Sequence, residues 1–309
     1  MSKKLVVLGS VNADHVLSVP RFPKPGETLV GSGYHIAYGG KGANQAVAAA
    51  RAGADVAFLS KVGNDSNGDL IAQHLATQGL SRMVLLRDAA GQTGVAMILV
   101  DAAGENQIVV VPGSNQQLTP ADVQQQAELI SGARVLLVQM EIPIETVQEC
   151  LRLAKRHGLL TILNPAPACP LPPECFRMID ILTPNEREAC VLSGVTDPTE
   201  AASILVNRGV GTVVVTRGAE GAVLSQGKDV MHVPAFSVDA IDSTGAGDAF
   251  NGAFACGLAE GLSIERALVM AAAAGALATT GHGAQTAMAS RDRIDRLCRF
   301  GMRRSRSLA

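Results

Sequence analysis

Short apolar runs alternate with amphipathic stretches along most of the chain. The run at 5–9 is continuous, which is typical of a strand buried on both faces. Further strands are predicted at 56–62, 135–139, 159–163, 179–182 and 212–216. Helices are predicted at 45–52, 68–78, 119–130, 144–157, 186–192 and 199–207, and the last third is predicted to be largely helical. The alternation predicts a three-layer α/β fold, with a mostly parallel central sheet covered by helices on both faces, in a single domain over 1–309.

Two segments depart from this alternation. Residues 11–38 contain several prolines and glycines between short alternating pieces. Residues 95–100 and 108–111 indicate a hairpin around Ala103-Gly104. Prolines and alternation argue against both a helix and a buried parallel strand. We therefore expect small, partly exposed strands that stand off the main body.

Polar side chains follow most of the predicted strands. In open α/β sheets, ligands bind at the carboxyl ends of the strands. Each of these side chains alone is also explained as a turn former or a helix cap. Their repetition at successive strand ends favours a binding site, and the residues concerned are Asn12, Asp14, Glu141, Asn164, Asn185, Glu188 and Thr216.

The stretch 242–252 carries the most specific chemistry. Gly245, Ala246 and Gly247 precede an apolar helical run, so their backbone N–H groups can face an anion at the positive end of the helix dipole. Asp248 follows as a fixed carboxylate, which suits phosphoryl transfer, where an acid group accepts a hydroxyl proton. The alternative is an ordinary loop with Asp248 as a helix cap, and the motif alone does not decide between the two.

Two other nucleotide-binding motifs are missing from the sequence. The glycine-rich loop at 39–44 contains Lys41, yet His35 and Gly42 stand where a Walker A motif needs glycine and serine or threonine. No Gly-x-Gly-x-x-Gly follows the first predicted strand. The dinucleotide fingerprint of a dehydrogenase is therefore absent.

Composition narrows the possible partners and the location. The net charge of −2 argues against a nucleic-acid or membrane-surface binder, and the apolar run at 267–278 is too short to span a bilayer. The six cysteines include no Cys-x-x-Cys pair and the histidines are scattered, so no zinc-type spacing exists. Scattered cysteines in a chain of this length are expected to be reduced thiols in the cytoplasm.

Taken together, the motifs resemble those of the ribokinase-like family of carbohydrate kinases, which includes adenosine kinases and fructokinases. The resemblance covers about 5–300. It rests on the combination of Gly39-Gly40-Lys41-Gly42-Ala43-Asn44-Gln45-Ala46, Val62-Gly63-x-Asp65, Asn164-Pro165-Ala166, Pro184-Asn185-x-x-Glu188 and Asp242-x-x-Gly245-Ala246-Gly247-Asp248.

The resemblance implies a role for each matching residue. Asp248 would be the general base, with an anion hole made by Gly245, Ala246 and Gly247. The sugar hydroxyls would be held by Asn12, Asp14, Gly40, Lys41, Asn44, Glu141 and Asp248. ATP would be bound by Asn185, Thr216, Arg217, Gly218, Ala219, Glu220, Gly221 and Gly247.

The resemblance also implies two cations. A potassium site would be formed by Asp242, Thr244, Ala278, Gly281, Gly283 and Ala287. Glu188 would act on Mg²⁺ through water, because Mg²⁺ keeps most of its water ligands in proteins. The chain departs from the family pattern in two places: some members have serine at the position of Ala287, and a basic residue is common at that of His282.

The implied activity is ATP-dependent phosphorylation of D-ribose at O5 to give D-ribose 5-phosphate, with Mg²⁺ and activating K⁺. A small β lid over about 15–38 and 93–112 would cover the sugar and join two copies into a homodimer, hiding exposed strand edges. The alternatives are a kinase for 2-deoxyribose or another sugar, and a non-catalytic regulator that binds sugar or nucleotide. Adenosine is disfavoured because few aromatic residues are present to stack on a base.

Overall fold

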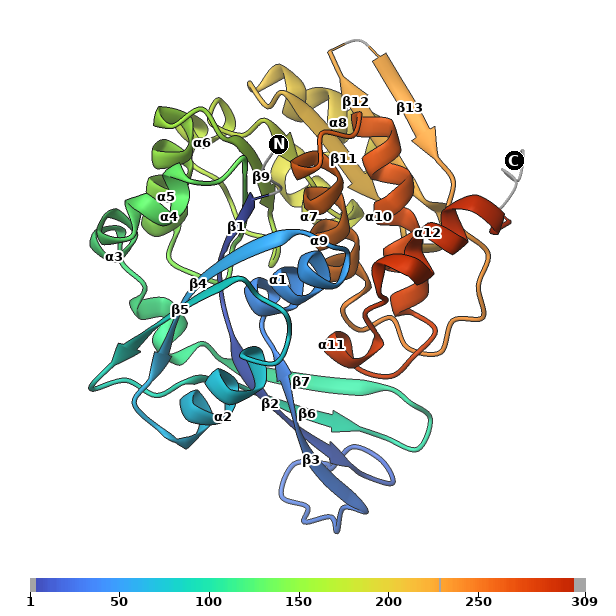
Figure 1. The fold of residues 1–309 in the computed structure, drawn as a ribbon. Helices are drawn as coiled ribbons and strands as arrows, with labels where there is room; N and C mark the ends of the chain where they lie inside the picture. Colours follow the sequence, from blue (N-terminus) through green and yellow to red (C-terminus); the bar gives the residue numbers. More distant parts are fainter. Residues whose placement is uncertain (1–3, 228, 303–309) are drawn as a thin grey trace.

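The fold contains two β-sheets, seen here in a computed structural model that describes residues 4–227 and 229–302. The larger sheet consists of β1 (Lys4–Leu8), β4 (Asp55–Gly63), β5 (Arg82–Asp88), β8 (Val135–Gln139), β9 (Leu160–Asn164), β10 (Ile181–Leu182), β11 (Thr212–Thr216), β12 (Ala222–Gln226) and β13 (Asp229–Val233). Its order is β13-β12-β11-β10-β9-β8-β1-β4-β5 (Figure 1). All of its pairings are parallel except β11–β12 and β12–β13. The predicted fold class, an α/β fold with a mostly parallel sheet, is confirmed.

Helices cover both faces of this sheet. One face carries α1 (Lys41–Arg51), α2 (Ser66–Leu75), α9 (Ala246–Ala259), α10 (Ile264–Ala278) and α12 (Arg291–Phe300). The other carries α3 (Pro120–Gln125), α4 (Ala127–Ser131), α5 (Ile144–Arg156), α6 (Pro173–Phe176), α7 (Glu186–Ser193) and α8 (Pro198–Asn207). A short helix α11 (Ala284–Ala287) and two 3-10 turns, η1 (Gly113–Gln117) and η2 (Gly218–Glu220), lie in the connections. Within the described ranges no helix is both long enough and apolar enough to cross a membrane.

The continuous apolar runs of the strands follow from burial on both faces. In β1, Leu5 and Val7 belong to the core under α1 and α9, whereas Val6 and Leu8 belong to the core under α5 and α8. Successive side chains of a strand point to opposite faces, so in a strand that is covered on both sides each position is buried and favours an apolar residue.

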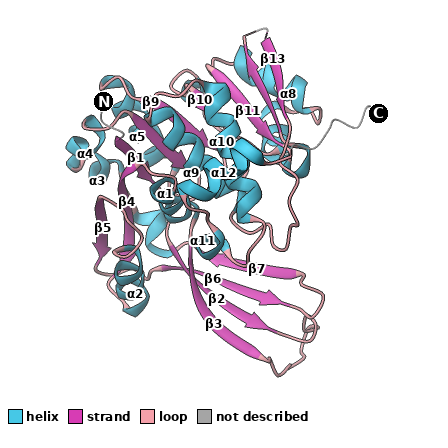
Figure 2. Cartoon of the chain, turned by 45° about the vertical axis from the view of Figure 1, so that its right-hand side comes forward, coloured by secondary structure: helices cyan, strands magenta, loops and turns pink. Residues whose placement is uncertain are grey.

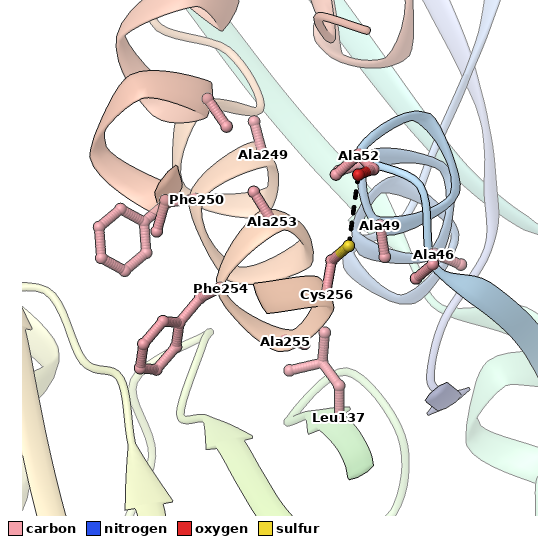
Figure 3. Packing of buried hydrophobic residues seen from close by; sticks show 14 of the residues in the cluster. Ala46, Ala49, Ala52, Leu137, Ala249, Phe250, Ala253, Phe254, Ala255 and Cys256 are labelled. Carbon is pink, nitrogen blue, oxygen red and sulfur yellow. Dashed lines mark hydrogen bonds between the residues drawn. The ribbon is translucent and has the colours of Figure 1, made fainter. Parts of the chain in front are cut away.

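Small residues bring α1 and α9 into close contact. Figure 3 shows alanines of both helices facing each other, with Cys256 Sγ donating to the carbonyl of Ala52 at 3.4 Å. At Gly252 an added Cβ would lie 2.6 Å from both Ala48 Cβ and the carbonyl oxygen of Gln45. Glycine is therefore required there for α9, which carries Asp248, to pack on α1.

The second sheet consists of β2 (Asn12–Ser18), β3 (Gly33–Gly39), β6 (Gly94–Val100) and β7 (Asn106–Val111), in the order β3-β2-β6-β7. It projects from the main body as a separate layer (Figure 2). The strands β2 and β6 pair in parallel, while β2–β3 and β6–β7 are antiparallel. The predicted hairpin is confirmed, and the segment at 11–38 contributes the other two strands.

The structure corrects four local predictions. The predicted helix at 119–130 is two helices, α3 and α4, divided at Gln126. Asn12 and Asp14 lie within β2 rather than at the end of β1. The strand β5 was missed because its apolar positions are only partly buried at the sheet edge. The hairpin β12–β13 interrupts the expected helical last third; its strands are five residues each, too short for periodicity to distinguish.

Candidate active site

The carboxylate of Asp248 lies buried in the first turn of α9, with 7% of the residue exposed. Its Oδ2 accepts a hydrogen bond from Asn44 Nδ2 at 3.0 Å, and its Oδ1 accepts one from Gln45 Nε2 at 2.9 Å. Burial raises the pKa of this carboxyl, while Lys41 and the two amide donors act in the opposite direction. The result is a fixed carboxylate with a raised pKa, which suits a general base.

Gln45 belongs to a buried amide network that the sequence analysis did not assign. Its Nε2 also donates to Asn164 Oδ1 at 3.0 Å, and its Oε1 accepts from Gln139 Nε2 at 2.7 Å. Asn164 donates in turn to the carbonyl of Thr183 at 2.9 Å. Gln45 follows Asn44 in the motif at 39–46, and its place in that motif was the feature of the sequence that could have pointed to a role at the site.

Close backbone contact places the start of α1 at the site. An added Cβ on Gly42 would lie 2.5 Å from the carbonyl carbon of Gly9 and 2.6 Å from the amide nitrogen of Ser10. The chain after β1 therefore touches the first turn of α1 directly, and this contact sets the position of Asn44 and Gln45.

Three carboxylates act on the ammonium of Lys41, and a fourth, that of Asp14, interacts with one of them. Burial alone lowers the pKa of Lys41, but Asp248, Glu141 and Glu188 raise it above its ordinary value. Burial, and then the charge of Glu141, raises the pKa of Asp14 to about 7. The predicted sugar-binding residues therefore come together around one positive charge, at the junction of the two sheets.

Further hydrogen bonds hold the sugar-side residues. Glu141 Oε2 accepts from the backbone N–H of Lys41 at 3.0 Å and from the hydroxyl of Ser10. Asn12 Oδ1 accepts from Asn115 Nδ2 at 2.8 Å. Ser10 and Asn115 were not predicted; both are buried polar residues, a property that only the structure shows.

The predicted anion hole lies at the N-terminus of α9. Gly245 has a φ of 73°, the left-handed conformation that glycine adopts most readily. The N–H of Ala246 donates to the carbonyl of Ser243 at 3.2 Å. The next N–H groups, those of Gly247 and Asp248, belong to the first helical turn, whose amides have no acceptor within the helix.

A pocket of about 320 Å³ adjoins this helix start. Its volume falls within the range of small-molecule sites. The predicted nucleotide residues Thr216, Gly218, Ala219, Gly221 and Gly247 line it. The lining residues that were not predicted are mostly apolar and come from other parts of the chain: Ala235, Phe236, Val238, Ala240, Ser243, Phe250, Ala272, Gly275, Ala276 and Thr279.

Three predicted nucleotide residues make other contacts and do not belong to the lining of this pocket. Arg217 pairs with Glu186 at 2.9 Å and with Glu220. Asn185 caps α7, accepting from the N–H of Glu188 at 2.8 Å. The predicted nucleotide residues therefore fall into two sets: those that line the pocket, and the polar residues Asn185, Arg217 and Glu220, which do not.

Two carboxylates occupy the predicted cation positions. Asp242 joins two loops: its Oδ1 accepts from the N–H of Thr244 and its Oδ2 from that of Gly283, both at 2.8 Å. Glu188 accepts from the backbone N–H of Asn185 at 2.8 Å and from its Nδ2 at 2.9 Å. Burial raises the pKa of Glu188. Among the described residues no group of three or more His, Cys, Asp or Glu residues forms a metal cluster.

Comparisons with known proteins identify the family of this chain. The model of the pfkB family carbohydrate kinases matches residues 2–291. A ribokinase of Haemophilus influenzae is 45% identical over 296 residues, which cover 94% of this chain and 97% of that protein. A deoxyribokinase of Salmonella typhi is 36% identical, with 93% and 95% covered.

Solved structures give the same result. A ribokinase of Thermotoga maritima superposes with a TM-score of 0.89 at 37% identity, covering 96% of this chain and 99% of that one. A ribokinase of Arabidopsis thaliana, solved with ribose and ATP, also gives 0.89, at 34% identity with 97% and 100% covered. The expected resemblance is confirmed: the chain belongs to the pfkB family of carbohydrate kinases.

Proposed function

We propose that this protein transfers the γ-phosphoryl group of ATP to O5 of D-ribose, giving D-ribose 5-phosphate and ADP. The observation that carries the proposal is the placement of Asp248. Its buried carboxylate is held by two amide donors on one side, and its helix begins at the apolar pocket on the other. The identity to ribokinases, higher than to the deoxyribokinase, favours ribose as the sugar.

Each group has a defined part in the reaction. Asp248 accepts the proton of the O5 hydroxyl while O5 bonds to the γ-phosphorus, and the bond from that phosphorus to the bridging oxygen of ADP breaks. The N–H groups of Gly245, Ala246 and Gly247 stabilise the transferring phosphoryl group, once the Ala246 amide exchanges its contact with Ser243 for the anion. Asn12, Asp14, Gly40, Lys41, Asn44 and Glu141 hold the sugar hydroxyls.

The structure suits ATP at the apolar pocket. The base lies among the alanines and Phe236, and the phosphates extend toward Gly247 at the start of α9. Asn185, Arg217 and Glu220 act at the polar edge of this pocket, where ion pairs with Glu186 and Glu220 hold the Arg217 side chain.

The donor sets also fit the two cations. Each oxygen of Glu188 accepts a hydrogen bond from Asn185 and keeps a lone pair for a water of Mg²⁺. For K⁺ we propose Asp242 and the carbonyls that the family resemblance implies, those of Thr244, Ala278, Gly281, Gly283 and Ala287; the hydrogen bonds from Asp242 to the N–H groups of Thr244 and Gly283, which join two of these segments, support this choice. Bound there, these cations neutralise phosphate charge and order the loops.

The four-stranded sheet would serve as the lid and as the dimer interface. Its edge strand β7 exposes four successive apolar residues, Ile108, Val109, Val110 and Val111. A second copy is the occupant we propose, because an exposed apolar edge strand invites pairing with an identical strand.

All six cysteines are thiols, in keeping with the proposed cytoplasmic location.

The test measures ADP release by the purified protein with ATP, Mg²⁺ and K⁺. Ribose, 2-deoxyribose, fructose and adenosine are compared in parallel, and phosphorus NMR of the product identifies the hydroxyl that is modified. We expect fast turnover with ribose alone. Turnover with another sugar only would refute the choice of substrate, and sugar binding without any turnover would favour the regulator.

A further inference from the structure

A row of polar side chains connects the four-stranded sheet to Asp248. Tyr38 of β3 stacks on His74 of α2, with ring centroids 4.1 Å apart and an interplanar angle of 17°. His74 Nε2 lies 2.8 Å from Gln285 Oε1, and Gln285 Nε2 donates to Asn44 Oδ1 at 3.1 Å. Asn44 Nδ2 then donates to Asp248 Oδ2 at 3.0 Å.

The carboxylate determines the direction of every hydrogen bond in this row. An ionised Asp248 only accepts, so Asn44 must turn its NH₂ group toward it and its oxygen toward Gln285. Gln285 must then present its own NH₂ to Asn44 and its oxygen to His74. His74 therefore carries a proton on Nε2 and donates it to Gln285.

The middle of the row is firmly held. Gln285 is only 4% exposed. Arg51 Nη1 donates to the carbonyl oxygens of Gln285 at 2.5 Å and Met288 at 3.0 Å, which anchors α11 to α1. His74 and Gln285 lie 211 positions apart in the chain, and neither belongs to the motifs read from the sequence.

We propose that His74 and Gln285 are positioning residues that keep the amide of Asn44 turned so that it donates to Asp248, and that Tyr38 links this row to the four-stranded sheet. The inference rests on the proposed function, because it concerns the base of that reaction. Without the Gln285 donor, Asn44 Oδ1 loses its hydrogen-bond partner, and only the contact with Asp248 still fixes the position of the Asn44 amide. The base would then be held less well, and the hydrogen bond that stabilises its carboxylate form would weaken.

The test compares Gln285→Met, His74→Phe, the double variant and His74→Gln. Methionine keeps the shape of glutamine without its amide, and phenylalanine keeps the stacking ring without a donor. His74→Gln restores a donor to Gln285. Gln73→Met, at an exposed position of the same helix α2, is the matched control and is expected to behave as wild type.

The pH profile of kcat for ribose is the informative readout. We expect Gln285→Met and His74→Phe to lower kcat about 3- to 30-fold and to move its acid limb to higher pH, with the ATP KM unchanged. The double variant should be no worse than Gln285→Met alone, and His74→Gln should recover part of the loss. Lys41, Glu141 and Glu188, the charged residues that face Asp248 from other elements, are intact in every variant.

An unshifted acid limb, or losses that simply add in the double variant, would overturn the positioning role. A carboxyl-carbon NMR titration of Asp248 reads the same pKa change without turnover. If wild type phosphorylates none of the sugars, the proposed function fails. The titration still decides the inference, since a higher Asp248 pKa in Gln285→Met supports the row and an unchanged pKa refutes it.

Discussion

Gln45 Nε2 lies 2.9 Å from Oδ1 of Asp248, although the two residues are 203 positions apart in the chain. This contact joins α1 to α9 at the point where the chemistry is proposed to occur. It leaves Oδ2 of Asp248 for the donor from Asn44, so each oxygen of the carboxylate has its own amide partner.

Replacing Gln45 should therefore change the proton affinity of the base. The Gln45 hydrogen bond lowers the pKa of Asp248 against the effect of burial, so Gln45→Leu raises that pKa further. We expect the acid limb of kcat to move up by about one to two pH units, since a hydrogen bond to a charged group contributes about 1.5–3 kcal/mol. A lower kcat with an unmoved acid limb would instead indicate damage to the fold.

Replacing Asp248 tests the base directly. Asp248→Asn keeps the shape and removes the proton acceptor, so turnover should fall about 10²- to 10⁴-fold. Binding of ribose and ATP, measured by calorimetry, should remain largely intact. Near-normal turnover in this variant would reject Asp248 as the base.

Asp14 is expected to lower stability at neutral pH. Its pKa is about 7 in the folded protein against 3.8 for an aspartate in water, so the folded state binds the proton more tightly. Stability then falls as pH rises from about 4 to about 7 and is constant above, at about 1.4 kcal/mol per pKa unit as an upper bound. Asp14→Asn should remove this loss and weaken ribose binding.

The measurement for Asp14→Asn is urea unfolding at several pH values. The gain in stability should grow between about pH 4 and about pH 7. Asp229→Asn, at an exposed site, is the control. A gain that is equal at all pH values would show that the charge of Asp14 is not its cause.

Filling the apolar pocket should weaken ATP binding alone. Ala276 of α10 lines the pocket, and Ala276→Leu places three further carbons inside it. The ATP KM should rise about tenfold or more, because overpacking costs about 1–3 kcal/mol, while ribose binding in the absence of ATP is unchanged. Arg266→Leu, at an exposed position of the same helix, is the matched control and should leave the ATP KM unchanged. An unaltered ATP KM in Ala276→Leu would show that the nucleotide binds elsewhere.

The fold class and the main residues proposed for catalysis could be predicted from the amino-acid sequence alone. Continuous apolar runs such as 5–9 report burial on both faces, and the glycines before Asp248 report a tight turn into a helix. Both are local requirements of the backbone. Such requirements restrict the residue types at neighbouring positions, so they can be recognised in the sequence.

Which distant side chains meet could not be predicted in this way and is seen only in the folded protein. The bonds of Gln45 to Asp248 and of His74 to Gln285 depend on how α1, α2, α9 and α11 pack, and no local pattern encodes them. The same holds for the parallel pairing of β2 with β6 and for the apolar pocket, whose lining comes from separate segments. These features arise from long-range packing, where small residues such as Gly252 let helices approach, and so they appear only once the chain is folded.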